Sequence, residues 1–366
     1  MKLRYKILSG LFGLLAIAVA ALAIVIGYTA PCEPAPESAS GGAQMKAIVY
    51  RCYGSPEVLA FEDVARPGPG ENEVLVKVEA ASVNPLDWHY MRGSPYLMRL
   101  GTGIGSPKDS RMGRDFAGVV TAVGEQVTEF KPGDEVFGGA SGAFAEYVLV
   151  SEDRAIAHIP VGVSFEQAAS LPVAALTAIQ ALRDKGDLQP GQKVLINGAS
   201  GGVGTFAVQI AKSMGAEVHG VCSTRNVELV RSLGADRVFD YKKEDVTESG
   251  EVYDLVIDMV GNHSLSKIRG VMSPDGKLVM VGGPSGNWVA PLKRPITALV
   301  SGPFFDQELI MLLARLRADD LAEVADLVQS GAVTPVIDRR FTLDDVPAAI
   351  AYSEEGRARG KILIEF

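Results

Sequence analysis

The sequence predicts an α/β protein in which a doubly wound parallel sheet is joined to a smaller β-barrel domain and preceded by a transmembrane helix. Three features carry this prediction: an uncharged apolar run near the N-terminus, a β-rich stretch after it, and a regular alternation of strands and helices from Lys193 onward. Strands that alternate with helices pair in parallel under covering helices. We expect a membrane anchor and linker over 1–44, a substrate domain over 45–166 completed by 306–366, and a nucleotide-binding domain over 167–305.

Length and composition are those of a folded globular protein of two domains. The chain has 366 residues, of which 47% are hydrophobic and 22% charged. Its net charge of −9 gives nucleic acid no electrostatic reason to bind. The three cysteines, Cys32, Cys52 and Cys222, form no CxxC motif and no zinc spacing, and we expect no disulfide framework among them.

The apolar run covers residues 7–28, which are 22 residues without a charge. As a helix it extends about 33 Å, enough to cross a hydrocarbon core of about 30 Å. Basic residues precede it, and Tyr5 and Tyr28 bracket it as interfacial aromatics do, so we expect an uncleaved membrane anchor. A cleaved signal peptide is the alternative, but the run is long for one. A lipoprotein signal fits less well, because Pro31 precedes Cys32.

The barrel domain is predicted from short apolar runs between 45 and 159. They are separated by turns in which proline presets φ and glycine accepts positive φ. Ser164 and Gln167 have the spacing of a capping box, so we expect a helix to begin there. The runs are EVLVKVEAASV (73–83), AGVVTAVG (117–124) and AEYVLV (145–150).

The nucleotide-binding domain is predicted from five strands with helices between them. The first strand enters a glycine-rich loop, and a helix follows the loop through Met214. The strands are KVLIN (193–197), the run ending at Cys222, RVFDY (237–241), YDLVIDMVG (253–261) and GKLVMVGG (276–283).

The loop GASGGVG (198–204) is the strongest functional motif. Its glycines have the spacing G-x-x-G-x-x-G between a strand and a helix. Without Cβ atoms the backbone turns tightly and approaches a pyrophosphate, while the helix N-terminus offers free N–H groups. A merely tight structural turn is the alternative, but it does not need three glycines at this spacing. We expect a dinucleotide to bind Gly198, Ser200, Gly201, Gly202, Val203 and Gly204.

The end of the second strand favours NADP(H) over NAD(H). NAD-binding folds carry an acidic residue about 20 positions after the loop, where it binds the ribose diol. This chain has Cys222 there, followed by Ser223, Thr224 and Arg225. Hydroxyl groups and a guanidinium suit a 2′-phosphate, and Tyr241 at the end of the third strand is expected beside the same pocket. The alternative is a solvated turn with an incidental arginine.

Several stretches occur in one order over nearly all of 45–366: ASVNPLDWHYMRG (81–93), GRDFAGVV (113–120), GDEVFG (133–138), GAFAEYV (142–148), LPVAALTA (171–178), INGASGGVG (196–204) and the closing 338–366. With them the chain resembles the medium-chain dehydrogenase/reductase superfamily, in its zinc-free quinone-oxidoreductase-like branch. The resemblance implies a GroES-like barrel beside a Rossmann domain, an active site in the cleft between them, and a possible homodimer.

Zinc-dependent members of that superfamily allow a test for metal. They place a cysteine where this chain has Asn84, a Gly-His-Glu where it has 113–115 (Gly-Arg-Asp), and a later cysteine near Val173. These residues do not form a zinc ligand set, so we expect no metal. Without a Lewis acid, plain alcohol oxidation is disfavoured. We expect hydride transfer to a quinone or an α,β-unsaturated carbonyl, for which the protein supplies orientation and a dry pocket.

The resemblance assigns roles in the cleft as hypotheses. Asn84 is placed near the nicotinamide or the substrate oxygen, Asp87 braces that loop, and either His89 or Tyr90 donates a proton. The alternatives are a turn residue before a proline and ordinary barrel packing. Further cofactor contacts are expected from Thr177, Val260, Gly261, Val281, Gly282, Gly283 and Lys361, the last reaching the adenosine phosphate or the cleft.

Two other functions stay open. One is a zinc-independent carbonyl or alcohol dehydrogenase, and the other is a membrane-tethered protein that binds NADPH with little catalysis. Location is also open, because basic residues before the anchor place the enzyme outside the cytoplasm, whereas NADPH is cytoplasmic. Either the charge rule fails, the cofactor is supplied on the far side, or the natural start is Met45, which makes the protein cytoplasmic.

Overall fold

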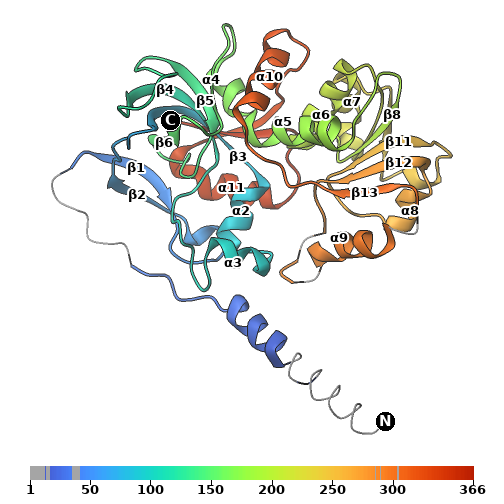
Figure 1. Ribbon diagram of the computed structural model, residues 1–366, viewed down its shortest axis with the longest axis horizontal. Coiled ribbons are helices and arrows are strands. Elements are labelled where there is room, and N and C mark those ends of the chain that lie inside the picture. The colour runs from blue at the N-terminus through green and yellow to red at the C-terminus, as the bar shows by residue number, and fades with distance from the viewer. Residues whose placement is uncertain (1–12, 14–16, 35–41, 285, 289, 303–304) are drawn as a thin grey trace.

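The computed structural model describes residues 13, 17–34, 42–284, 286–288, 290–302 and 305–366. A barrel domain and a nucleotide-binding domain lie side by side, and an N-terminal helix projects away from the barrel domain (Figure 1). The predicted α/β class, with a Rossmann domain and a GroES-like domain, is confirmed by this arrangement.

The barrel domain is built on a seven-stranded sheet. Its order is β14-β15-β3-β4-β5-β7, with β6 also paired to β3, and β1 and β2 form a separate antiparallel pair. The apolar run 73–83 forms β3 over its whole length, as predicted. The strands are β1 (Gln44–Val49), β2 (Ala60–Ala65), β3 (Glu73–Val83), β4 (Asp115–Val123), β5 (Glu135–Gly139), β6 (Tyr147–Ser151), β7 (Ile156–His158), β14 (Ile337–Thr342) and β15 (Lys361–Glu365).

The nucleotide-binding domain is a six-stranded parallel sheet in the order β10-β9-β8-β11-β12-β13. Its last strand follows residue 305, so the sheet extends past the expected domain boundary. The strands are β8 (Lys193–Asn197), β9 (Glu217–Cys222), β10 (Arg237–Asp240), β11 (Tyr253–Asp258), β12 (Met272–Met280) and β13 (Glu308–Met311).

Helices cover the nucleotide-binding sheet and close one end of the barrel. Helices α5 and α6 pack on each other, and α11 packs on α2. Ser164 and Gln167 form the predicted capping box at the start of α4, with N–H···O distances of 3.2 and 3.0 Å. The helices are α2 (Pro85–Arg92), α3 (Arg99–Thr102), α4 (Phe165–Ala169), α5 (Pro172–Ile179), α6 (Gly202–Ser213), α7 (Val227–Ser232), α8 (Leu265–Arg269), α9 (Ala290–Ser301), α10 (Ala318–Gln329) and α11 (Val346–Glu354).

The last barrel strand joins the two domains. The Gly360 N–H donates to the Ser200 carbonyl at 3.1 Å, and Gly360 forms a β-bridge with Gly201 of the glycine-rich loop. Because β15 also pairs with β3, the C-terminal strand brings the barrel interior into contact with the dinucleotide loop. Strand β15 therefore fixes where the glycine-rich loop lies relative to strand β3 of the barrel domain.

The N-terminal segment departs from two expectations. The predicted membrane span, 7–28, lies partly outside the described residues; 17–27 are helical. Over the part of the chain that the structure describes, no helix has the length and apolar character needed to cross a membrane. The prediction of no disulfide framework is wrong: Cys32 and Cys52 are bonded, with Cα atoms 4.7 Å apart, because the chain just before Cys32 lies against the barrel domain, where the Ala30 N–H donates to the Gly105 carbonyl.

Candidate active site

The glycine-rich loop leaves β8 and enters α6 at Gly202, as the motif predicts. Gly198 has φ +93°, which favours glycine. A Cβ on Gly204 would lie 2.2 Å from the Gly198 carbonyl oxygen, so the helix packs directly on the strand end. A Cβ on Gly201 would contact only that same oxygen, at 3.6 Å, and the space in front of the helix N-terminus is therefore open to a phosphate group.

The predicted adenosine pocket lies at the end of β9. Ser223 is half-buried, while Thr224 and Arg225 are exposed. The Arg225 guanidinium donates to the Arg357 carbonyl at 2.5 Å, which holds it over this edge of the sheet. Tyr241 is 56% exposed and its N–H donates to the Cys222 carbonyl at 3.1 Å. The strand pairing thus brings Ser223, Thr224, Arg225 and Tyr241 to one edge.

A carboxylate that sequence reasoning missed lies beside this pocket. Asp240 ends β10 and is in register with Cys222. Burial raises the pKa of Asp240. The hydrogen bond from the Thr224 hydroxyl and the nearby Lys243 ammonium (3.4 Å) lower it by more, so the pKa of Asp240 lies below its ordinary value. The sequence did not reveal Asp240 because the spacing from the glycine loop identifies only the end of β9. The register between β9 and β10, which brings Asp240 to Cys222, is known only from the structure. Cys222 is neutral, since burial raises the pKa of its thiol to about 11.

The second predicted edge of the dinucleotide site is organised by Asp258 at the end of β11. Its carboxylate accepts the N–H groups of Val260 (3.1 Å) and Gly261 (2.9 Å). Its carbonyl accepts those of Val281 (2.9 Å) and Gly282 (3.2 Å). The strand ends that were expected to contact cofactor are therefore fixed to each other. The two strand ends approach closely at Gly282, because a Cβ there would lie 2.2 Å from the Met259 carbonyl oxygen. Gly283 is different, since no atom lies within 4 Å of a Cβ placed on it.

Arg294, on α9, was also missed. Its side chain is buried and its Nη2 lies 2.7 Å from Asp258 Oδ2. Its Nη1 would lie 2.8 Å from a Cβ on Gly261, so glycine is required there to admit the guanidinium. The helix that carries Arg294 follows the last predicted strand, and no motif in the sequence marks it.

Asn84, Asp87, Asp115 and Lys361 form a buried polar cluster where β15 and β3 pair. The Lys361 ammonium, 2% exposed, donates to Asn84 Oδ1 at 2.6 Å and to Asp115 Oδ2 at 3.2 Å. Asn84 Nδ2 donates to the same Asp115 oxygen at 2.8 Å, and the Asn84 N–H donates to Asp87 Oδ2 at 2.7 Å. Because Lys361 is only a donor, it fixes the orientation of the Asn84 amide. The side chain of Lys361 thus lies with the residues that were predicted for the cleft.

Asp87 titrates near neutrality in this cluster. Its carboxyl group is almost completely buried. Burial raises the pKa of Asp87 to about 7, and the negative charge of Asp115 adds to this, while the hydrogen bond from the Asn84 N–H opposes it. A proton is therefore available on Asp87 at physiological pH.

Of the two predicted proton donors, Tyr90 lines a cavity and His89 does not. Tyr90 and Asp87 line a cavity of about 350 Å³ whose wall also includes Lys108 and Arg114. The Arg114 guanidinium lies 4.6 Å from the centre of the Tyr90 ring. His89 instead places Nδ1 2.6 Å from the Ser94 carbonyl, and burial lowers the pKa of His89, so the neutral ring donates from Nδ1 and has no proton on Nε2.

Thr177 lies in α5, and its hydroxyl donates to the Val173 carbonyl one turn earlier at 2.6 Å. The side chain is nearly buried. Its hydrogen is thus used within the helix, and only the oxygen lone pairs are left for a ribose hydroxyl.

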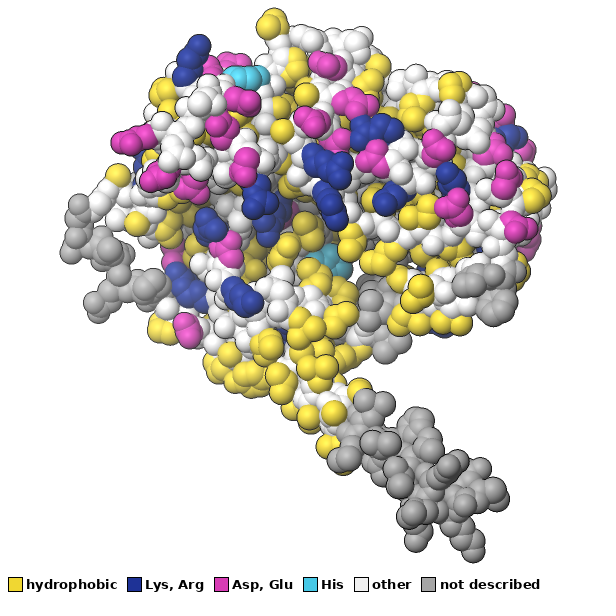
Figure 2. Space-filling model, viewed as in Figure 1, with side chains coloured by type: hydrophobic (Ala, Val, Ile, Leu, Met, Phe, Trp, Pro, Cys, Tyr) yellow, Lys and Arg dark blue, Asp and Glu magenta, His cyan; other side chains and the backbone are white. Residues whose placement is uncertain are grey.

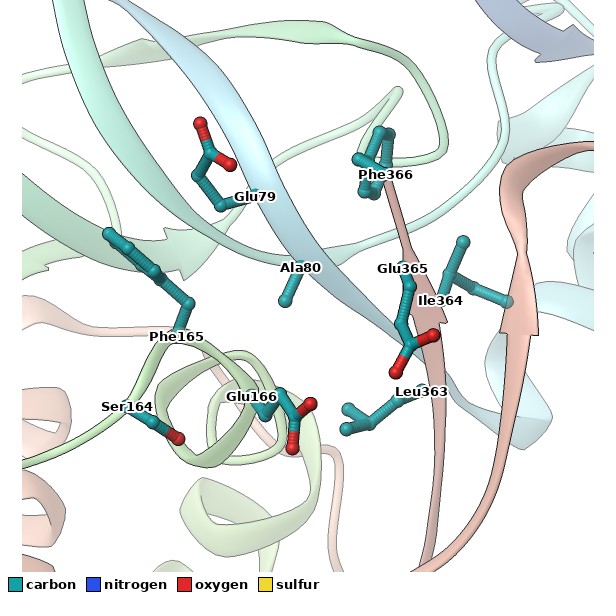
Figure 3. Close-up of a pocket in the computed structure, with 9 residues that line it drawn as sticks. All are labelled: Glu79, Ala80, Ser164, Phe165, Glu166, Leu363, Ile364, Glu365 and Phe366. Carbon is teal, nitrogen blue, oxygen red and sulfur yellow. The ribbon is translucent and has the colours of Figure 1, made fainter.

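A larger cavity, of about 640 Å³, lies elsewhere on the barrel domain and contains none of the predicted site residues. Figure 3 shows the carboxylates of Glu79, Glu166 and Glu365 around it. Lys77 pairs with Glu79 at 2.7 Å, and Arg340 pairs with Glu166 at 2.7 Å and with Glu365 at 3.2 Å. Each of these carboxylates thus has a lysine or arginine partner within ion-pair distance.

The positions that match zinc ligands in metal-dependent enzymes come together around Asp115. Asp115 Oδ1 accepts the Val173 N–H at 3.1 Å, and Oδ2 accepts from Asn84 and Ser82 as well as from Lys361. Within the described residues, no group of three or more His, Cys, Asp or Glu side chains is arranged to hold a metal ion. The Lys361 ammonium group thus lies beside Asn84 and Asp115, two of the positions that match zinc ligands.

Comparison with known proteins supports the same architecture. The family model for the alcohol dehydrogenase GroES-like domain matches residues 70–161, and that for zinc-binding dehydrogenase matches 233–364. The chain is 36% identical over 341 residues to a chloroplast envelope quinone oxidoreductase homolog of Arabidopsis thaliana, which covers 88% of this chain and 99% of that protein. It is 33% identical over 336 residues to an NADPH-dependent alkenal/one oxidoreductase, chloroplastic, of the same organism, covering 88% and 79%.

A solved structure agrees with these relatives. The quinone oxidoreductase from Coxiella burnetii superposes with a TM-score of 0.79 at 32% identity, covering 88% of this chain and all of that one. Relatives of this kind support an NAD(P)H-dependent oxidoreductase activity. The chain belongs to the medium-chain dehydrogenase/reductase superfamily, in its zinc-free quinone-oxidoreductase-like branch.

Proposed function

We propose that the protein transfers hydride from NADPH to a quinone or to the β-carbon of an α,β-unsaturated carbonyl, without a metal ion. The observation that carries this proposal is the buried ammonium group of Lys361, bound to Asn84 and Asp115 at 2.6 and 3.2 Å. A divalent cation at this place would meet a fixed positive charge, which disfavours it. The cluster therefore supports a reaction in which the Lys361 ammonium, and not a metal ion, provides the positive charge.

The substrate class follows from that chemistry. Without a Lewis acid, the acceptor itself must stabilise the negative charge that hydride addition leaves on it. Quinones and conjugated carbonyls do so by delocalisation, and two relatives carry these substrates in their names. Addition of hydride and of one proton gives a hydroquinone or a saturated carbonyl compound, which balances the reaction.

The residues at the sheet edge fit a phosphorylated dinucleotide. Gly202 and Val203 begin α6 and offer backbone N–H groups at the helix N-terminus, whereas the Gly201 N–H donates to the Gly198 carbonyl at 3.1 Å. Arg225 and Thr224 offer donors for a 2′-phosphate. When bound, NADPH supplies the hydride. Asp240 is a carboxylate at this edge, and Lys243 offsets its charge.

The cleft residues take distinct roles in this proposal. Lys361 stabilises negative charge that develops on the substrate and holds the Asn84 amide in one orientation. Tyr90 donates the proton from the cavity wall. His89 is a positioning residue, because its hydrogen bond to the Ser94 carbonyl fixes the turn after α2.

A substrate panel with NADPH and NADH side by side tests the proposal. We expect reduction of quinones or enones with kcat/KM at least tenfold higher for NADPH, and no reduction of simple aldehydes. Arg225→Ala should reduce the NADPH value about tenfold and leave the NADH value unchanged. Arg231→Ala is the matched control, since Arg231 is an exposed arginine six positions further along the chain, paired with Glu228.

Three outcomes contradict the proposal. A preference for NADH refutes the cofactor assignment, and reduction of simple aldehydes favours a carbonyl reductase. Tight NADPH binding without oxidation by any acceptor favours a binding protein. A homodimer joined through the edges of the nucleotide-binding sheet stays a prediction, for which β10 and β13 are the edge strands.

A further inference from the structure

The N-terminal helix is fixed to the barrel domain by one buried arginine. The Arg99 guanidinium donates to the carbonyl oxygens of Ile26 (3.2 Å) and Tyr28 (2.8 Å), at the end of the helix over 17–27. Its faces lie against the rings of Tyr53 and Tyr96, at 4.5 and 4.2 Å. The last carbonyl groups of a helix have no partner within it, so a buried cation at this end is a specific attachment.

Three further contacts fix the direction in which the helix leaves. The Ala30 N–H donates to the Gly105 carbonyl at 2.9 Å, and the Cys32–Cys52 disulfide follows two residues later. A Cβ on Gly27 would lie 3.0 Å from the Trp288 ring, so the helix end is in close contact with the loop before α9. The segment is therefore an ordered part of the enzyme, held at both domains.

The helix itself is apolar, and most of the side chains described in it are exposed, with Ile26 at the attached end buried. No charged residue occurs from 7 to 28. Ile17 is 67% exposed and Ile24 75% exposed, and Val19, Leu22 and Val25 are also exposed. A helix that is hydrophobic all round is stable in a protein core or in lipid, and not in water. Something not present in the structure must cover it.

Apolar side chains are exposed on the domains as well. They are Leu97, Leu100 and Ile104 around α3, and Ile296, Leu299 and Val300 on α9, the helix that begins two residues after Trp288. We call these six residues and the helix over 17–27 the apolar face. Hydrophobic side chains gather where the helix leaves the domain and continue along it (Figure 2). Leu299 is 79% exposed, which is costly for a surface that stays in water.

We propose that the apolar face docks on a lipid bilayer, and that the substrate is a lipid-borne acceptor that enters from the membrane. Aromatic side chains mark the level of the membrane surface: Tyr28, Tyr96 and Trp288 lie together where the helix meets the domain, with the rings of Tyr96 and Trp288 4.8 Å apart. Trp and Tyr concentrate at this depth in membrane proteins. A second copy of the chain would need no such belt.

The cavity that contains Asp87 and Tyr90 shares a chain segment with this face. Gly101, Thr102 and Lys108 line the cavity, and they belong to the same segment as Leu100 and Ile104 of the apolar face. We take this segment as the route by which an acceptor in the bilayer reaches the cavity. This part of the inference rests on the proposed function; the docking does not.

The test uses the full chain with vesicles of phosphatidylethanolamine and phosphatidylglycerol that contain a long-chain quinone. We expect kcat/KM for the vesicle-borne quinone to be at least tenfold above that for a short-chain, water-soluble quinone. Leu97→Ser with Leu100→Ser should remove most of that advantage while the rate with the soluble quinone stays within twofold. Val161→Ser with Val252→Ser is the control, because both valines are exposed outside the face.

A second readout is independent of catalysis. Brominated lipids should quench the tryptophan fluorescence of the wild type, and Trp288→Phe should remove most of the quenching. Absence of quenching, or equal rates for the two quinones in wild type and variant, overturns the docking. A change of oligomeric mass in the leucine variant without quenching overturns it in favour of a second copy. Quenching without reduction of any quinone supports docking and refutes the proposed function.

Discussion

Replacing Lys361 by methionine tests the ammonium group at the centre of the cleft. Methionine retains most of the aliphatic chain that packs on Gly202, with Cδ 3.4 Å from a Cβ placed there, so the change removes mainly charge. Lys361 Nζ lies 3.2 Å from an Asp115 oxygen that is completely buried. At an effective dielectric constant of about 20, this separation corresponds to ~5 kcal/mol of attraction. Breaking a buried pair by removing one partner costs about 3–5 kcal/mol, and we expect a loss in this range.

A double-mutant cycle separates the pair from the individual residues. Urea unfolding followed by circular dichroism and by tryptophan fluorescence gives the stability of Lys361→Met, Asp115→Asn and the double variant. The double variant should be less destabilised than the sum of the two singles by at least ~2 kcal/mol, because no lone buried charge is left. Lys193→Met is the control: its partly exposed pair with Glu251 should contribute under about 1 kcal/mol. Additive losses within about 0.5 kcal/mol would refute the charge argument.

Three other predictions concern pH, proton donation and the disulfide. Since ionised Asp87 opposes negative charge on the substrate, kcat with an enone should fall as the pH rises through about 7, and Asp87→Asn should flatten that profile; an unchanged profile removes Asp87 from the site. Tyr90→Phe should lower kcat at least tenfold without weakening NADPH binding by fluorescence titration, and unchanged turnover would exclude Tyr90 as donor. Thiol labelling of the denatured natural protein should detect Cys222 alone, with Cys32 and Cys52 reactive only after reduction; three free thiols would contradict the bond.

The fold was predictable because its local signals agree with one another. The run 193–197 forms β8 with the predicted ends, and the capping box at Ser164 starts α4 as expected. These signals are short-range: the period of apolar residues, a turn residue, a side-chain cap. The cleft cluster is different, because Lys361 reaches Asn84 across 277 positions through the antiparallel pairing of β15 with β3. No local pattern specifies which long-range strand pairing occurs, so the sequence left the lysine at the adenosine phosphate or in the cleft, and only the strand pairing brings it to Asn84.

The same limit explains the N-terminal segment, where the structure adds most to the sequence. An uncharged run predicts an apolar helix, but not that Arg99 binds its end or that Cys32 meets Cys52. Disulfides persist mainly in oxidising compartments. The oxidation state of Cys32 and Cys52 in the natural protein therefore reports on the redox conditions in which the enzyme is kept, and sequence spacing alone gives no sign of the pairing because it depends on how the chain near residue 30 meets the barrel domain.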